Sequence, residues 1–350
     1  MGFATALVNG KAEEATTGAG QKTAVPLQAD EGVVRSGFRG KIMETASSVV
    51  LRDELLAALS VIIKTLTYAV MLPLIASLAC GVRNEIERIH RLGNILDANP
   101  SDKEILMQLV EYLNNPNPSL RTQAVSAMGN LGAKHSDILG DAVVPLLIAR
   151  LRDNDAFVRR YAVKGLGQYG RKAEPAVDPL QEVLTQYKEE DSSWLAADVL
   201  GNLGPAAISA VPELIKSLDE KGPEGSIHEF AMQKSAGMAL YRLSPLGRDG
   251  TTELRGRVRR LSGEACLYVA LAILKSQPRD PQGTKALAGV LTAEDKAAGV
   301  ALREIDGIPV TLFDLNVLLP ALDQCSRSTD EYVRRLSSKQ FARFKASASR

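Results

Sequence analysis

The chain has few aromatic residues, and its charges nearly cancel. Aromatics make up 5% of the 350 residues, while Leu, Ala and Val dominate, a balance that favours interdigitating helices over a sheet of β-branched and aromatic residues. The formal net charge of +1 gives the whole chain no strong field to attract nucleic acid or an anionic membrane. We therefore expect an all-α protein with almost no strand, and we do not expect nucleic acid as its main partner.

Residues that hold metals or perform catalysis are also scarce. The three cysteines, Cys80, Cys266 and Cys325, lie far apart without CxxC spacing, which indicates neither a zinc site nor a disulfide framework. Three histidines leave little room for a multi-histidine metal site or for histidine-based catalysis. The sequence contains no Gly-x-Ser-x-Gly elbow, Walker A loop or HExxH motif. We therefore predict no catalytic residue, no metal site and no cofactor.

The first 60 residues differ in composition from the rest. Residues 1–40 are rich in Gly, Ala, Thr and Ser and have few large apolar side chains, so burial cannot offset the entropy cost of ordering them. We interpret residues 1–60 as a disordered segment or as a mistaken N-terminal extension, in which case translation would start near Val61. N-terminal mapping of the native protein tests the second interpretation.

An uncharged run covers residues 65–82 and as a helix would extend about 27 Å. It fits a membrane span, a secretory signal or a buried helix, although Pro73 and the unbroken apolarity disfavour the last. The stretch from Ile75 to Gly81 resembles the lipobox of bacterial lipoproteins, with Ser77 where that family most often has Leu. The resemblance implies acylation of Cys80. We therefore expect residues 61–82 to be a signal peptide or transmembrane anchor, and the protein to reside in a bacterial cell envelope; a cytoplasmic protein is the alternative.

The rest of the chain carries a repeated pattern of a small residue followed four residues later by an apolar one. The pairs are Ala124 and Met128, Ala162 and Leu166, Ala196 and Leu200, Ala236 and Leu240, Ala270 and Leu274, Ala298 and Leu302, and more weakly Ser337 and Phe341. Their spacing is typical of helical hairpins, in which the small residue lets two helices approach closely. Residues 104–345 are therefore predicted to form an α-solenoid of about seven hairpins, after a linker or capping helix over residues 83–103.

Glycine and proline positions predict where the first hairpins turn. Gly132, Gly170 and Gly204 close the first three units and suit helix ends with left-handed backbone. The prolines that follow are expected in the first turn of the next helix; they are Pro145, Pro179 and Pro212.

The run from Pro145 to Asp153, followed by Asp155 to Ala162, resembles the HEAT-repeat family, particularly its short bacterial form related to phycobilisome lyase-type repeats. In that family an Asp before the second helix and an Arg in its first turn commonly pair between neighbouring repeats. The resemblance implies this repeat-stacking role for Asp153 or Asp155 and for Arg121, Arg159 and Arg334.

The same resemblance implies a function in binding. HEAT proteins commonly use the concave face formed by their second helices, so the first hypothesis is a non-enzymatic scaffold for a protein or peptide. An alternative is a chromophore carrier or enzyme of the bilin lyase kind, and a weaker one is a nucleic-acid-binding HEAT-like protein. An arginine cluster is a candidate patch for an anionic partner, or else a solvated helix face; its members are Arg248, Arg255, Arg257, Arg259 and Arg260.

Overall fold

The computed structural model describes residues 79–187, 190–219, 227–293 and 295–348, and six positions between 59 and 71. The chain divides into two compact units, Met1–Ala76 and Ser77–Arg350, and the fold described below belongs to the second. The predicted extension over residues 1–60 and most of the predicted anchor over residues 61–82 lie outside the described residues.

Within the described ranges the regular elements are helical and there is no strand, which confirms the all-α prediction. Residues 79–98 are helical. The α-helices that follow are α2 (Lys103–Leu113), α3 (Pro118–Arg150), α4 (Ala156–Gln168), α5 (Val177–Gln186), α6 (Asp191–Leu203), α7 (Val211–Ser217), α8 (Ile227–Leu243), α9 (Arg248–Arg257), α10 (Gly263–Ser276), α11 (Pro281–Ala293), α12 (Asp295–Glu304), α13 (Leu315–Cys325) and α14 (Glu331–Ala348). Short 3-10 segments join some of them: η1 (Gly170–Ala176), η2 (Gly204–Ala210), η3 (Val258–Arg260), η4 (Ile305–Gly307) and η5 (Val310–Leu312).

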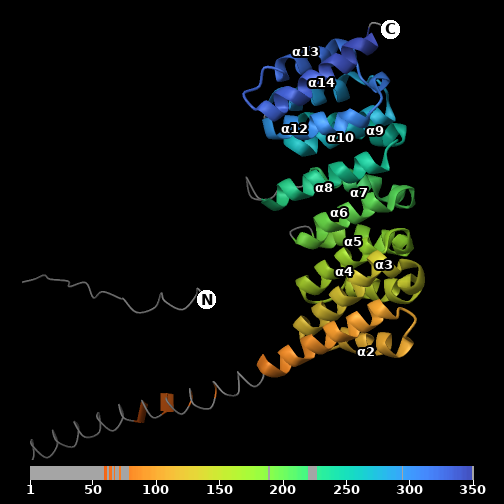
Figure 1. The fold of residues 1–350 in the computed structure, drawn as a ribbon, viewed down its shortest axis with the longest axis vertical. Helices are drawn as coiled ribbons and strands as arrows, with labels where there is room; N and C mark the ends of the chain where they lie inside the picture. Colours follow the sequence, from red (N-terminus) through yellow and green to blue (C-terminus); the bar gives the residue numbers. More distant parts are fainter. Residues whose placement is uncertain are drawn as a thin grey trace, which may run out of the picture. The chain divides into compact units, whose positions relative to one another are not determined.

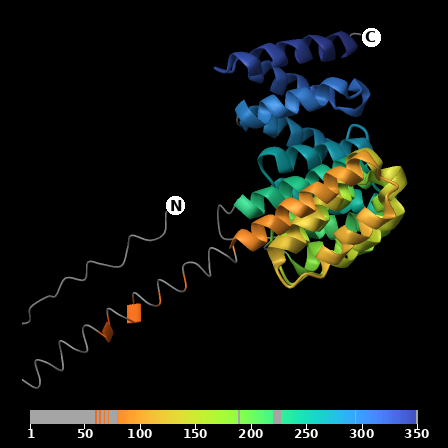
Figure 2. The same ribbon diagram turned by 60° about the horizontal axis from the view of Figure 1, so that its bottom comes forward.

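The helices of this unit form an α-solenoid of helical hairpins stacked in sequence order (Figures 1 and 2). We call the layer of first helices the A layer: α2, the second half of α3, α5, α7, α9, α11 and α13. The B layer comprises the first half of α3, α4, α6, α8, α10, α12 and α14, and each of these helices packs on the next. The described helices thus make seven A/B pairs, in agreement with the predicted number.

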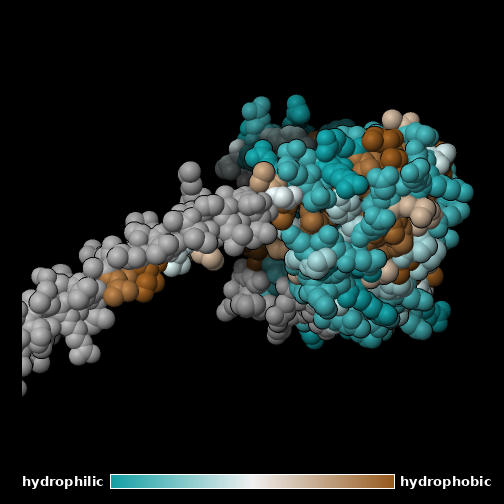
Figure 3. All heavy atoms as spheres, turned by 90° about the horizontal axis from the view of Figure 1, so that it is seen from below, coloured by the Kyte–Doolittle hydropathy of each residue, from teal (hydrophilic) through white to brown (hydrophobic). Residues whose placement is uncertain are grey.

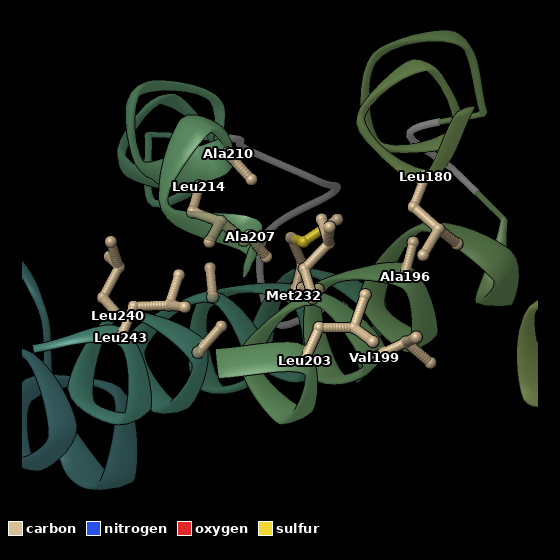
Figure 4. Close-up of a cluster of buried hydrophobic side chains, with 14 of the residues drawn as sticks. Leu180, Ala196, Val199, Leu203, Ala207, Ala210, Leu214, Met232, Leu240 and Leu243 are labelled. Carbon is tan, nitrogen blue, oxygen red and sulfur yellow. The ribbon is translucent and has the colours of Figure 1, made fainter. Parts of the chain in front are cut away.

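Small residues in the B layer permit this stacking. The six alanines of the repeated pattern and the apolar residue four positions after each are all at most 1% exposed, as the pattern predicts. Figure 4 shows part of the resulting core, where Leu180 of α5 and Leu214 of α7 point from two A helices toward α6 and α8, which carry Val199 and Met232. Burial of such side chains contributes about 1.5–3 kcal/mol each, so each hairpin is stabilised mainly by its neighbours.

The predicted turn residues behave in two ways. Gly170 and Gly204 adopt left-handed backbone, with φ of 52° and 64°, as expected. Gly132 does not: α3 continues past it and bends at His135 (φ −125°, ψ 23°). Pro145 consequently lies inside α3 rather than in the first turn of a new helix. The prediction was wrong here because the Tyr169 ring packs against Gly132, where an added Cβ would meet it at 2.6 Å; close packing explains this glycine.

Side-chain caps fix several helix starts. Asp102 accepts hydrogen bonds from the backbone N–H groups of Glu104 and Ile105, each at 3.1 Å, and so begins α2. Asp155 does the same for α4, and Asn117 and Asp314 cap α3 and α13. Such caps contribute about 1 kcal/mol each.

The helix over residues 79–98 packs against the first hairpin. Ile89, Leu92 and Leu96 are buried there, and the Asp97 carboxylate accepts hydrogen bonds from Lys134 at 2.7 Å and His135 at 2.9 Å. Seen from the α2 end, the surface is mostly hydrophilic, with separate hydrophobic patches (Figure 3). A water-facing outer surface of this kind is what a terminal repeat requires.

Among the described residues, the stretch Asp191–Ser217 is long and apolar enough to cross a membrane by length and composition. It is made of α6, η2 and α7, and the chain turns within it at Gly204. Leu200 and Leu214 from this stretch are fully buried between the two layers. The apolar residues of this stretch therefore form part of the solenoid core.

Candidate binding face

The first arginine to which the family resemblance gave a stacking role joins neighbouring repeats. Arg121, in the first turn of α3, donates from its guanidinium to both Asp153 carboxylate oxygens, at 3.0 Å and 2.8 Å. Burial acts to raise the pKa of Asp153, but the hydrogen bonds from Arg121 and from the Asp155 backbone outweigh it and lower that pKa. This paired, part-buried carboxylate is a structural link between two B helices.

Arg159 makes the corresponding link one repeat later, with a carboxylate that sequence reasoning missed. In the first turn of α4, it pairs with Glu190 and also donates to the backbone oxygen of Asp153. Its guanidinium stacks on the Tyr187 ring, 4.3 Å from the centroid. Only its place in the sequence could have indicated Glu190. It directly precedes α6, and Asp153 likewise lies just before α4.

The two remaining residues of the predicted stacking set do not cross between repeats. Asp155 accepts from the backbone N–H groups of Phe157 and Val158, so it caps α4. Arg334 is exposed and donates to the carbonyls of Ser328 and Thr329 in the loop before its own helix. Among the described residues no B helix follows α14, so Arg334 has no following repeat to pair with there.

The predicted anionic-partner patch does not form one surface of available guanidinium groups. Arg255 pairs with the buried carboxylate of Asp280, and Arg257 pairs with Asp219 at 2.8 Å. Among the described residues no carboxylate lies within ion-pair distance of the other three, which are exposed; they are Arg248, Arg259 and Arg260. Of these, Arg259 lines a cavity in the A layer.

The most distinctive side chains of the B layer gather over α8 and α10. The rings of Tyr241 and Tyr268 lie 6.1 Å apart between centroids. The Lys275 ammonium sits 4.5 Å from the Tyr241 centroid and donates to the Tyr241 carbonyl at 3.1 Å. Burial, with the nearby Glu304 carboxylate, raises the pKa of Tyr268 to about 12, and burial lowers the pKa of Lys275. These groups form a partly dehydrated aromatic and cationic cluster.

Charged groups surround this cluster on adjacent B helices. Arg242 and Arg303 are exposed and act to lower the pKa of Tyr268, so they lie within electrostatic range of its ring. Lys234 of α8 pairs with Glu264 of α10 at 2.7 Å.

A carboxylate at the edge of this region lacks a full set of partners. Burial raises the pKa of Asp198 on α6, while the neighbouring Ser235 hydroxyl and the charges of Arg242 and Lys234 act in the opposite direction. Its Oδ1 atom is buried, and no described residue hydrogen-bonds to it. An unsatisfied buried carboxylate oxygen costs about 1–3 kcal/mol, which makes Asp198 a candidate functional residue. Trp194, one turn before Asp198 on α6, is half-buried and packs against the core. We call Trp194, Asp198, Tyr241, Arg242, Tyr268 and Arg303 the B-layer face.

This face is equipped for recognition. Half-buried Trp194 and Tyr241 and exposed Arg242 and Arg303 lie at its surface, while Tyr268 and the unsatisfied Oδ1 atom of Asp198 are buried just beneath. No group of three or more His, Cys, Asp or Glu residues that could hold a metal ion occurs among the described residues.

Comparison with known proteins places HEAT repeats within the solenoid. Residues 144–225 match the family model of HEAT repeats, and residues 118–169 match that of HEAT-like repeats. No curated protein matches the chain.

Several solved structures are similar at low identity. The complex of CpcE and CpcF of phycocyanin lyase from Nostoc sp. PCC7120 is 21% identical, with a TM-score of 0.44, over 67% of this chain and 93% of that chain. An archaeal HEAT-like repeats protein from Thermococcus onnurineus NA1 is 13% identical, with a TM-score of 0.43, over 74% and 92%. An engineered protein is 20% identical, with a TM-score of 0.46, over 72% of each chain.

Proposed function

We propose that this solenoid, with HEAT repeats between residues 118 and 225, is a non-enzymatic scaffold that binds a protein or peptide on its B-layer face. The unsatisfied Oδ1 of Asp198 carries the proposal. The unsatisfied oxygen destabilises the unbound protein, and this free energy is recovered when a partner donates a hydrogen bond to it. Because this oxygen is buried while the residue as a whole is half-buried, we infer that the Asp198 side chain turns toward the surface on binding and accepts a hydrogen bond from a backbone N–H or a cationic side chain of the partner.

The other residues of the face supply the apolar and cationic contacts. Tyr, Trp and Arg are enriched at energetic hot spots of protein interfaces because they combine a large apolar surface with a hydrogen-bonding end. Here Trp194 and Tyr241 pack against the solenoid core and Tyr268 is buried, so ordering them costs little entropy on binding. Exposed Arg242 and Arg303 would meet acidic groups of the partner.

Site-specific photocrosslinking in the native host tests this function. Asn202 is exposed on α6, one turn after Asp198, and is replaced by benzoylphenylalanine. The control places the same label at exposed Thr252 on α9 in the A layer. A defined adduct from position 202 that is absent from position 252 and lost in an Asp198→Lys background supports the proposal. Equal adducts from both positions, or adducts unaffected by Asp198→Lys, contradict it.

We also propose that residues 61–82 direct the scaffold to a bacterial membrane, where acylated Cys80 anchors it. The uncharged run and the lipobox-like sequence support this tether, and Cys80 is exposed in the structure. Two or three acyl chains hold a protein firmly, at about 0.8 kcal/mol per buried methylene. Cys80→Ala should move the protein from the membrane to the soluble fraction if acylation is the anchor. Unchanged membrane recovery of the variant, together with no acyl mass on Cys80 of the wild-type protein, would contradict it.

A further inference from the structure

A large cavity opens in the A layer, away from the B-layer face. Its volume is about 690 Å³, and it lies between η3, the start of α10 and one side of α11. Val258, Leu261, Ala286 and Val290 form much of its apolar wall. Pockets for small molecules typically measure about 300–1,000 Å³ and have mainly apolar walls with a few placed polar groups.

The cavity exists because two neighbouring A helices do not close on each other here. Helix α11 packs on α10 and α13. Its contact with the A layer of the preceding repeat is made through η3, which directly follows α9. A groove between the A helices of the second and third repeats offers an internal comparison, since α3 and α5 leave only about 220 Å³ there. In that smaller groove Arg152 pairs with Glu182, so its cation is already neutralised.

The larger cavity has two cations without such neutralisation. Arg259 and Lys285 line it and are exposed, and none of the described residues that line it is acidic. Among the described residues, neither cation has a carboxylate within ion-pair distance. Two cations beside an apolar wall favour a ligand with an anionic head and an apolar body.

Gln282 positions one of these cations. In the amide orientation that satisfies both neighbours, its nitrogen donates to the Arg255 carbonyl at 3.2 Å and its oxygen accepts from Arg259 at 3.0 Å. Arg255 is itself held by the Asp280 carboxylate, which also caps the start of α11. The Arg259 head group is therefore connected to α11 before any ligand binds.

We propose that this cavity binds a small amphipathic monoanion, of which a medium-chain carboxylate is the simplest representative. The head group lies between Arg259 and Lys285, and the apolar body extends along Val258, Leu261 and Val290. This ligand site is distinct from the proposed protein-binding face because its residues belong to η3, the loop before α10, the first turn of α10 and α11, and none of them is in the B-layer face.

A glycine on the cavity wall permits a sharp test. Gly289 of α11 lines the cavity, and a Cβ built there meets no atom within 4 Å. Gly289→Phe should place an aromatic ring inside the cavity, where it obstructs the path of the ligand's apolar body, without disturbing the helix. The matched control is Gly256→Phe: Gly256 is also an exposed helical glycine with open space at its Cβ, and it does not line the cavity.

Calorimetric titration of the full chain with decanoate, and with uncharged decanol, measures the binding. We expect one decanoate per chain, at least about ten-fold tighter than decanol. Gly289→Phe should abolish both, whereas Gly256→Phe should leave both unchanged. Lys285→Gln and Arg259→Gln should each weaken decanoate about ten-fold without affecting decanol. Absence of saturable decanoate binding, equal affinity for decanol, or unchanged binding in a folded Gly289→Phe variant overturns the proposal.

Discussion

Gly129 of α3 and Gly165 of α4 face each other where the two B helices cross. A Cβ added to Gly129 would lie 2.6 Å from the Gly165 Cα atom, and one added to Gly165 would lie 3.0 Å from the Gly129 Cα atom. Both residues are buried, and the obstructing atoms belong to the backbone. The helices can therefore approach this closely only with glycine at both positions.

Gly129→Ala should destabilise the protein by about 2 kcal/mol, because overpacking a core with one methyl group forces the backbone apart. Urea unfolding followed by circular dichroism measures the change. Gly256→Ala is the control, since this exposed helical glycine has open space around it and alanine should stabilise its helix by about 0.5–1 kcal/mol. Equal midpoints for the two variants would contradict the close crossing of α3 and α4.

The Arg121 and Asp153 pair should contribute to stability in a pH-dependent way. Arg121→Met leaves a carboxylate that is only 6% exposed without its main partner, so a loss of about 2 kcal/mol at pH 7 is expected. Because the folded pKa of Asp153 is lowered, its contribution is present above the unfolded pKa of about 3.9 and disappears as the pH falls through the folded pKa. The difference between wild type and Arg121→Met should therefore shrink below about pH 4.

Arg334→Met is the matched control for this pair. Arg334 occupies the same first-turn position in α14 but bonds only loop carbonyls, so its loss should cost less than about 1 kcal/mol. A cost similar to that of Arg121→Met would show that the carboxylate pair is not what stabilises the repeat junction.

The three thiols should differ strongly in reactivity. Cys80 is exposed, whereas Cys266 and Cys325 are buried, and burial raises the pKa of Cys266 to about 11. Because the thiolate is the reacting form, a disulfide reagent at pH 8 should label one thiol per unacylated native chain rapidly and all three in denaturant. Cys80→Ala should remove the rapid phase; rapid labelling of Cys266 in the native protein would contradict its burial.

The repeat core could be predicted from sequence because its requirements are local and periodic. The Ala162 and Leu166 pattern repeats wherever B helices stack, and Gly170 and Gly204 mark true turns. Gly132 shares the same motif but serves packing against Tyr169, a contact 37 positions away that no local pattern encodes. The pairing within the arginine cluster could not be predicted in full for a related reason, since the Asp280 and Asp219 carboxylates that engage Arg255 and Arg257 come from other segments of the chain. Glu253, which also pairs with Arg257, is local.

The B-layer face could not be predicted residue by residue. Tyr241, Tyr268 and Glu304 come from three different repeats and meet only after stacking. Asp198 resembles any polar residue in a helix until its surroundings are known. Its unsatisfied Oδ1 is a property of the packing between α6 and its neighbours.

Asp198→Asn tests whether Asp198 serves partner binding at a cost to the stability of the fold. Because the folded pKa of Asp198 is raised, the wild-type protein should lose stability as pH rises from the unfolded pKa of about 3.9 through the folded pKa. The amide removes this titration and the buried charge, so the variant should be more stable at pH 7 by about 1 kcal/mol. Thermal unfolding between pH 4 and pH 8 measures the effect.

The most direct measurement combines this variant with partner capture. The Asp198→Asn protein, labelled with benzoylphenylalanine at position 202, is compared with the Asp198 protein for unfolding midpoint and adduct yield in the same host. A higher midpoint at pH 7 together with a large loss of the adduct is the expected result. A lower midpoint with an unchanged adduct would mean that Asp198 serves the fold and that the B-layer face does not bind the partner through it.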